Sequence, residues 1–195
     1  MLQSLLNAWR LPDLRKKLLF TALVIAIYRL GCYIPVPGIS VDAVKEMFNT
    51  GGVFDFYNLF AGGGLERVAI FAMGIMPYIT ASIIMQLLTM VIPRLEMLMK
   101  EGESGQKKVN QYTRYFTGAL AFIEAIGFVF LFRSYGAFPP DAPLNGTRFW
   151  LIVMTLTVGA ILVMWMGELI TQRGIGNGIS LMIFASIVSR LPSGL

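Results

Sequence analysis

The stretch from Phe71 to Pro93, FAMGIMPYITASIIMQLLTMVIP, constrains the fold more than any other part of this 195-residue chain. It is long enough to cross a bilayer, which takes about 20 apolar residues. Pro77 interrupts it near its start, and the half-apolar, glycine-containing segment 53–67 precedes it. Broken backbone survives at membrane depth only where protein or water satisfies its polar groups. The pattern therefore predicts a short helix that leads into an interrupted membrane helix beside a cavity.

Composition places the chain in a membrane and argues against an enzyme. Hydrophobic residues make up 56% of the sequence and charged residues 14%, whereas soluble domains carry about 25% charge. The chain has one cysteine, Cys32, and no histidine. An internal disulfide is therefore excluded, and the commonest general base and metal ligand is missing. We expect no catalytic residue, cofactor or metal site.

Apolar periods predict an all-α integral membrane fold with five transmembrane helices. The expected spans are 18–34, 69–92, 112–132, 149–170 and 179–193. The first span could be a cleaved signal sequence, but Arg29 interrupts it and no small-residue cleavage site follows, so we expect it to be retained. Arg29 lies near the far end of that span, where its side chain is expected to snorkel to the headgroups.

The connecting segments fix the expected orientation. Residues 1–17 form an amphipathic segment that Pro12 interrupts, 39–52 an external loop, and 93–111 and 171–178 cytoplasmic loops. With the N-terminus inside, ten basic residues lie on the cytoplasmic side and five outside, as the positive-inside rule requires. This bias accounts for most of the basic excess behind the net charge of +5 and removes the need for nucleic acid as a generic partner, while an RNA-rich cytoplasmic partner that meets these loops stays open.

Two further patterns have competing interpretations. The glycines between Gly174 and Gly178 resemble a phosphate-binding loop, but they follow a membrane helix rather than a strand, which favours a simple tight turn. Glu168 and Arg173, five residues apart at a helix end, are expected to form an interfacial ion pair.

Residue patterns alone leave the site open. Isoleucines recur at i, i+4 spacing in two spans, and this pattern by itself favours core packing or contact with lipid over a functional role. Segment 53–67 is either an external interfacial helix or part of the cavity, and the glycines at 62–64 within it are expected to be a hinge or a helix stop. Glu124 is a carboxylate deep within a span, where a functional role is the default expectation.

Several motifs, in order along the whole chain, resemble the SecY/Sec61-alpha protein-translocation channel family. They are IPVPGI (34–39), NLFAGGGLER (58–67), GIMPYITASIIMQLL (74–88), KEGESGQKK (100–108), QYTRY (111–115) and WMGELITQRGIGNGISLMIFASIV (165–188). The resemblance covers only the first half of a ten-helix, inverted-repeat channel. It implies a split second helix, with a plug followed by a span, and a missing second half.

The resemblance assigns expected roles to individual positions. The pore ring would comprise Ile75, Ile79, Ile179 and Ile183. The plug, over 53–67, would use Phe54, Phe56, Tyr57, Leu59, Phe60, Gly62, Gly63 and Gly64. The lateral gate would include Thr80, Gln86 and Glu124. Cytoplasmic partners would meet Lys100, Lys107, Lys108 and Arg173.

The function implied by this resemblance is the pore subunit of a protein translocon in a bacterial inner membrane. Expected partners are SecE-type and SecG-type subunits, the SecA motor, the ribosome, signal peptides and nascent chains, the second half of the channel and membrane lipid. Two alternatives remain: half of an inverted-repeat secondary transporter, in which broken helices also recur, and a scaffold subunit that conducts nothing by itself.

Overall fold

The computed structural model describes residues 11–49, 53–138 and 144–189, and its regular structure there is helical apart from one isolated bridge between Pro35 and Ala69. Most of the amphipathic segment expected over 1–17 lies outside the described residues. The helices are α2 (Pro12–Gly31), α3 (Val41–Asn49), α4 (Val53–Phe60), α5 (Met76–Val91), α6 (Pro93–Lys100), α7 (Glu103–Ser134), α8 (Gly146–Arg173) and α9 (Gly178–Val188).

Helices α7 and α8 are long and apolar enough to cross a membrane, and α5 with α6 forms a third candidate that bends by 98° between the two. Helix α9 is apolar but shorter. Helix α2 carries five charged residues, including a cluster of three cations in its first two turns. The all-α membrane fold is thus confirmed, while the count of five spans stays a prediction.

Prolines begin helices in this fold instead of breaking them. Pro12, Pro77 and Pro93 each occupy one of the first helical positions of α2, α5 and α6. Proline suits these positions because its φ angle is already helical and its missing N–H would have no partner there. The interruption predicted at Pro77 is therefore a helix start: residues 61–75 form turns, and the helix expected from residue 69 begins only at Met76.

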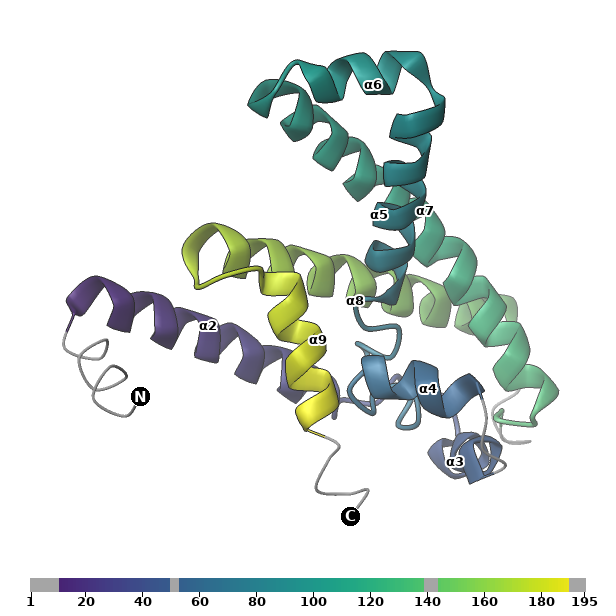
Figure 1. Cartoon of the computed structure of the whole chain (residues 1–195). Helices are drawn as coiled ribbons and strands as arrows, with labels where there is room; N and C mark the ends of the chain where they lie inside the picture. Colours follow the sequence, from purple (N-terminus) through teal and green to yellow (C-terminus); the bar gives the residue numbers. More distant parts are fainter. Residues whose placement is uncertain (1–10, 50–52, 139–143, 190–195) are drawn as a thin grey trace.

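Residues 93–111, expected to be a loop, are mostly helical. Helix α6 and the first turns of α7 form a hairpin with α5 that projects from the rest of the fold, at the end opposite α3 and α4 (Figure 1). Glu–Lys pairs at i, i+4 spacing, Glu96 with Lys100 and Glu103 with Lys107, support both helices. The segment expected as an external loop, 39–52, likewise contains α3.

Two apolar clusters hold the helices together. One joins α3, the turns after α4, α7 and α8, and includes Val44, Leu65, Val129 and Leu156. The other joins α2, the start of α5, α8 and α9. Ser40 N–H donates to the carbonyl of Ala137 at 2.8 Å, which ties the chain before α3 to the end of α7. The turns after α4 lie where these clusters meet.

Candidate functional site

The structure gathers the four isoleucines expected in the ring into one apolar cluster. Ile75, just before α5, is 2% exposed, and Ile79, Ile179 and Ile183 are partly buried against the same cluster. Asn177 caps the start of α9, accepting from the N–H groups of Ile179 and Ser180. The i, i+4 spacing then places both α9 isoleucines on one face.

Helix α4, the expected plug, packs with one face inward and leaves the other exposed. Tyr57 contacts Phe128 of α7 edge-to-face, with ring centroids 5.3 Å apart, and its hydroxyl donates to the carbonyl of Met73. Burial raises the pKa of Tyr57 well above its ordinary value, with a further contribution from Glu124, so the hydroxyl stays a donor. Phe56 is exposed and lies edge-to-face against Phe60.

The remaining plug positions complete this picture. Leu59 is half-buried, and Gly62, Gly63 and Gly64 are all buried in the turns that follow α4. The triglycine thus ends the helix, as expected from its composition. The side chain of Phe54 lies outside the described residues.

The turns after α4 are bonded internally and to α2. Asn58, 1% exposed, accepts from the N–H of Glu66 at 3.2 Å and donates to its carboxylate at 3.3 Å. Arg29 of α2 donates from Nη1 to the carbonyl of Gly62 at 2.9 Å. The expectation that Arg29 snorkels to headgroups is therefore wrong in this structure. Its guanidinium lies against the plug turn, where the backbone carbonyl of Gly62 accepts its hydrogen bond.

Glu124 lies on α7 beside the plug. Its Oε2 atom is buried and has no hydrogen-bond partner in the described part of the chain. Glu124 lines an open, mostly apolar hollow of about 260 Å³ together with Tyr57, Phe128 and Leu131. No hydrogen bond joins it to Thr80 among the described residues. A buried carboxylate oxygen without a partner needs a hydrogen-bond donor from water, from another segment or from a partner protein. Otherwise the carboxyl group must itself be protonated.

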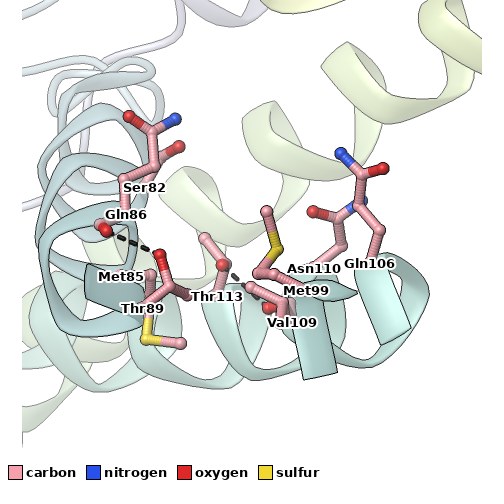
Figure 2. Close-up of a pocket in the computed structure, with 9 residues that line it drawn as sticks. All are labelled: Ser82, Met85, Gln86, Thr89, Met99, Gln106, Val109, Asn110 and Thr113. Carbon is pink, nitrogen blue, oxygen red and sulfur yellow. Dashed lines mark hydrogen bonds between the residues drawn. The ribbon is translucent and has the colours of Figure 1, made fainter. Parts of the chain in front are cut away.

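Gln86 lies apart from Glu124. It lines a polar hollow of about 90 Å³ between α5, α6 and α7 (Figure 2). Asn110 and Thr113 of α7 line the same hollow. Glu124 lies three helical turns, or about 16 Å, further along α7 than Thr113. The three expected gate residues are therefore not one cluster within this chain. Thr80 precedes Gln86 on α5 and is half-buried.

The end of the fold expected to be cytoplasmic contains an ion pair that the sequence did not predict. Glu168 of α8 accepts from Nε of Arg114 on α7 at 2.5 Å, so the expected pair with Arg173 is wrong. Residues five apart on a helix point about 140° apart, which keeps Arg173 away. The Arg114–Glu168 pair borders a cleft of about 270 Å³ that also includes Tyr78, Asn177 and Ile179 of the ring.

The cations expected to meet cytoplasmic partners are exposed. Lys100 and Lys107 pair with glutamates on their own helices, while Lys108 and Arg173 are open to solvent. Exposed pairs of this kind contribute little to stability. Their side chains remain accessible to a partner.

The glycine-rich turn between α8 and α9 uses some of its N–H donors for hydrogen bonds within the fold. Ile175 N–H donates to the hydroxyl of Thr21, and Gly178 N–H donates to that of Thr171. A β-carbon at Gly178 would overlap the carbonyl of Gly167, so the glycine permits close packing of two helices. This arrangement favours a structural turn over a phosphate site. No group of metal-binding side chains occurs in the described part of the chain.

Comparison with known proteins gives consistent results. A family model described as SecY matches residues 69–195. Protein translocase subunit SecY of Streptomyces scabiei is 50% identical over 208 aligned residues, covering 100% of this chain and 47% of the relative. The same subunit of Pseudomonas aeruginosa is 49% identical, covering 98% of this chain and 43% of the relative. This chain thus spans about half the length of these relatives.

Solved structures agree. A structure described as Sec61 in the canine ribosome–channel complex from the endoplasmic reticulum aligns with a TM-score of 0.62 and 25% identity, over 90% of this chain and 36% of that one. A second, on the SecY plug domain and the closed state of the translocation channel, aligns with a TM-score of 0.64 and 25% identity, over 92% and 37%.

Proposed function

The chain belongs to the SecY family, and from that premise we propose that it forms one half of a protein-conducting channel. The channel would pass unfolded secretory chains across the membrane and release apolar segments sideways into lipid. The observation that carries this proposal is the cluster of Ile75, Ile79, Ile179 and Ile183, with the plug helix α4 packed against α9, the helix that supplies two of them.

A constriction lined by isoleucine suits this function. A narrow apolar ring does not hold a continuous column of water, so it resists ions while its side chains deform around a peptide. A ring of charged residues would attract ions instead. The four isoleucines form half of such a ring, and the second half of the channel would supply the rest.

The plug and the gate would respond to the translocating chain. Displacement of α4 is a shift between two populations, and a peptide drives it by binding the open state more tightly than the closed one. Glu124, with an unpartnered oxygen beside Tyr57, would exchange partners when α7 moves. Thr80 and Gln86 would face the second half at other levels of the gate.

The proposal contains no chemical step, and energy would come from partners. These are the SecA motor or the ribosome on the cytoplasmic side, where Lys100, Lys107, Lys108 and Arg173 are accessible. A ribosome partner is supported by the structural neighbour from the canine ribosome–channel complex. SecE-type and SecG-type subunits, signal peptides, nascent chains and lipid complete the set. Bacterial relatives support a location in the inner membrane, and the charge bias supports a cytoplasmic N-terminus.

The test is ion flux through vesicles that contain this chain assembled with the second half of the channel. We expect low ion flux at rest, a large increase when residues 53–64 are deleted, and an increase when a signal-peptide-bearing chain is added. Saturable uptake of a small solute, with no response to plug deletion, would instead indicate a secondary transporter. Absence of any flux in all forms would favour a scaffold subunit.

A further inference from the structure

The turn that follows the plug helix is seated in a cradle of three side chains from two membrane helices. A β-carbon at Gly62 would lie 3.0 Å from Nη1 of Arg29 and 3.4 Å from both the Ser186 and Tyr28 hydroxyl oxygens. Gly62 has φ +63°, a left-handed conformation that favours glycine. With glycine at position 62, the turn can therefore approach α2 and α9 more closely than it could with any other residue type there.

The floor of this cradle is fixed and buried. The hydroxyls of Tyr28 and Ser186 lie 2.9 Å apart, and each residue is 1% exposed. Ser186 donates its only proton to the carbonyl of Met182, so Tyr28 is the donor to Ser186. Tyr28 also stacks on Phe71, with ring centroids 6.0 Å apart. Neither hydroxyl is available to bond the plug.

Arg29 is therefore the side chain of the cradle that bonds the plug turn directly. Its Nη1 donates to the carbonyl of Gly62 at 2.9 Å, and a charged donor makes this bond stronger than one between neutral groups. Arg29 forms no ion pair among the described residues. Its Nη2 lies 3.4 Å from the Tyr33 hydroxyl, and its guanidinium lies 5.6 Å from the centre of that ring. After the bond to Gly62 breaks, the Arg29 guanidinium would keep its contact with Tyr33.

We propose that Arg29 is a latch that holds the plug turn against α2 and α9 and thereby sets how readily the plug leaves. The latch joins the plug to α9 through the Tyr28–Ser186 contact, and α9 also carries Ile179 and Ile183. A chain that spreads the ring would move the floor of the cradle and weaken the latch. This inference rests on the proposed plug function and adds the residue that regulates it.

The single cysteine of the chain provides a reporter. Cys32 is 0% exposed, and its Sγ lies 3.9 Å from the carbonyl of Ala61 in the plug turn. While the turn is in place, the thiol is shielded from reagents in water. The test is the rate at which a water-soluble maleimide labels Cys32 in the assembled channel in vesicles, without any translocating chain.

We expect Arg29→Ala to raise the labelling rate at least about tenfold, and Arg29→Lys, which keeps one charged donor, to raise it less. Arg67→Ala is the matched control, because Arg67 also lies over Tyr33, at 4.2 Å, whereas the bond to the Gly62 carbonyl comes from Arg29. Loss of a nearby cation by itself slows the reaction of a thiol with maleimide, since the thiolate is the nucleophile and the cation stabilises it. Faster labelling of Cys32 in Arg29→Ala would therefore report greater exposure of the thiol to water.

A second probe separates a latch from general loosening. Thr117 of α7 is 0% exposed and bonded to its own helix, so Thr117→Cys in a Cys32→Ala background should stay protected when Arg29 is replaced. Unchanged labelling of Cys32 in Arg29→Ala would overturn the proposal, and so would equal increases at both probes. The thiol readout does not depend on conduction, so it remains informative even if the flux experiment fails.

Discussion

The plug turns and the hairpin of α6 and early α7 are both polar interruptions of an apolar chain, but they are built in opposite ways. The plug turns are buried, and their polar groups are bonded within the molecule, as Asn58 and Arg29 illustrate. The hairpin of α6 and early α7 is exposed, and the two ion pairs described there join residues of the same helix. In Figure 1 the hairpin projects from the top of the fold, whereas the turns after α4 lie near its centre, between α4 and the start of α5.

The two regions therefore differ in the interactions that stabilise them. Buried contacts hold the turns after α4 in place, and removing one of their members leaves a cavity or an unpaired polar group. The hairpin contributes its own helix propensity and little tertiary packing, which leaves its surface available for partners. We therefore expect substitutions to be costly near the plug and nearly silent for stability at the hairpin.

The largest effect is expected at Phe71, which packs between Tyr28 and Gly31 and is 7% exposed. Phe71→Ala should lower the free energy of unfolding by about 3–5 kcal/mol, because it removes a buried ring and leaves a cavity. Reversible unfolding in mixed detergent micelles would measure it. Phe184→Ala, at an exposed position on α9, is the control and should cost far less. Equal losses at both positions would remove the distinction between buried and exposed faces.

A smaller effect is expected at Gly31, where a β-carbon would overlap the Phe71 ring. Gly31→Ala should destabilise by about 1–3 kcal/mol through overpacking. Gly127→Ala on α7 is the matched variant, since nothing lies within 4 Å of a β-carbon there. It should stabilise by up to about 1 kcal/mol, because alanine favours helix over glycine. The two changes in melting temperature should have opposite signs, and the same sign would contradict the packing account.

The Arg114–Glu168 pair lies between these extremes, because the Arg114 side chain is 43% exposed and that of Glu168 is 15% exposed. A double-mutant cycle with Arg114→Ala and Glu168→Ala should give a coupling of about 0.5–1 kcal/mol, reduced by solvent screening. Added salt should weaken the coupling. A coupling that stays the same in high salt would indicate that the two residues act through packing alone.

The smallest effect on stability is expected at Lys107, whose pair with Glu103 is exposed. Lys107→Ala should change the free energy of unfolding by less than about 0.5 kcal/mol. The Lys107→Glu variant should nevertheless weaken binding of an added ribosome or motor in a sedimentation assay, because it reverses an accessible charge. A loss of stability without a loss of binding would reverse the contrast between the two regions.

The sequence predicted the fold best where local chemistry decides it. The triglycine ended α4 as expected, and the apolar periods located α7 and α8. The hairpin was predicted to be a loop because of its charge, although Glu96–Lys100 and Glu103–Lys107 spacing is itself a helix signal. Pro77 was expected to interrupt a helix, whereas it lies at the start of α5.

The site was harder to predict because its contacts depend on how distant segments meet. Nothing in the local sequence shows that Arg29 reaches the carbonyl of Gly62, or that Glu168 pairs with Arg114 rather than Arg173. The separation of Gln86 from Glu124 follows from where α5 starts and how it packs on α7. The ring isoleucines were placed by resemblance, and the structure gathers them in one cluster. Their contact with a translocating chain stays a prediction.

The central claim is that the isoleucine cluster surrounds a translocating polypeptide, and site-specific crosslinking tests it most directly. A photoreactive amino acid at Ile183 in the assembled channel should form an adduct with a polypeptide arrested during translocation. The same group at the neighbouring Phe184, which is 64% exposed on α9, should crosslink to lipid instead. Adducts at Phe184 with none at Ile183 would contradict the account.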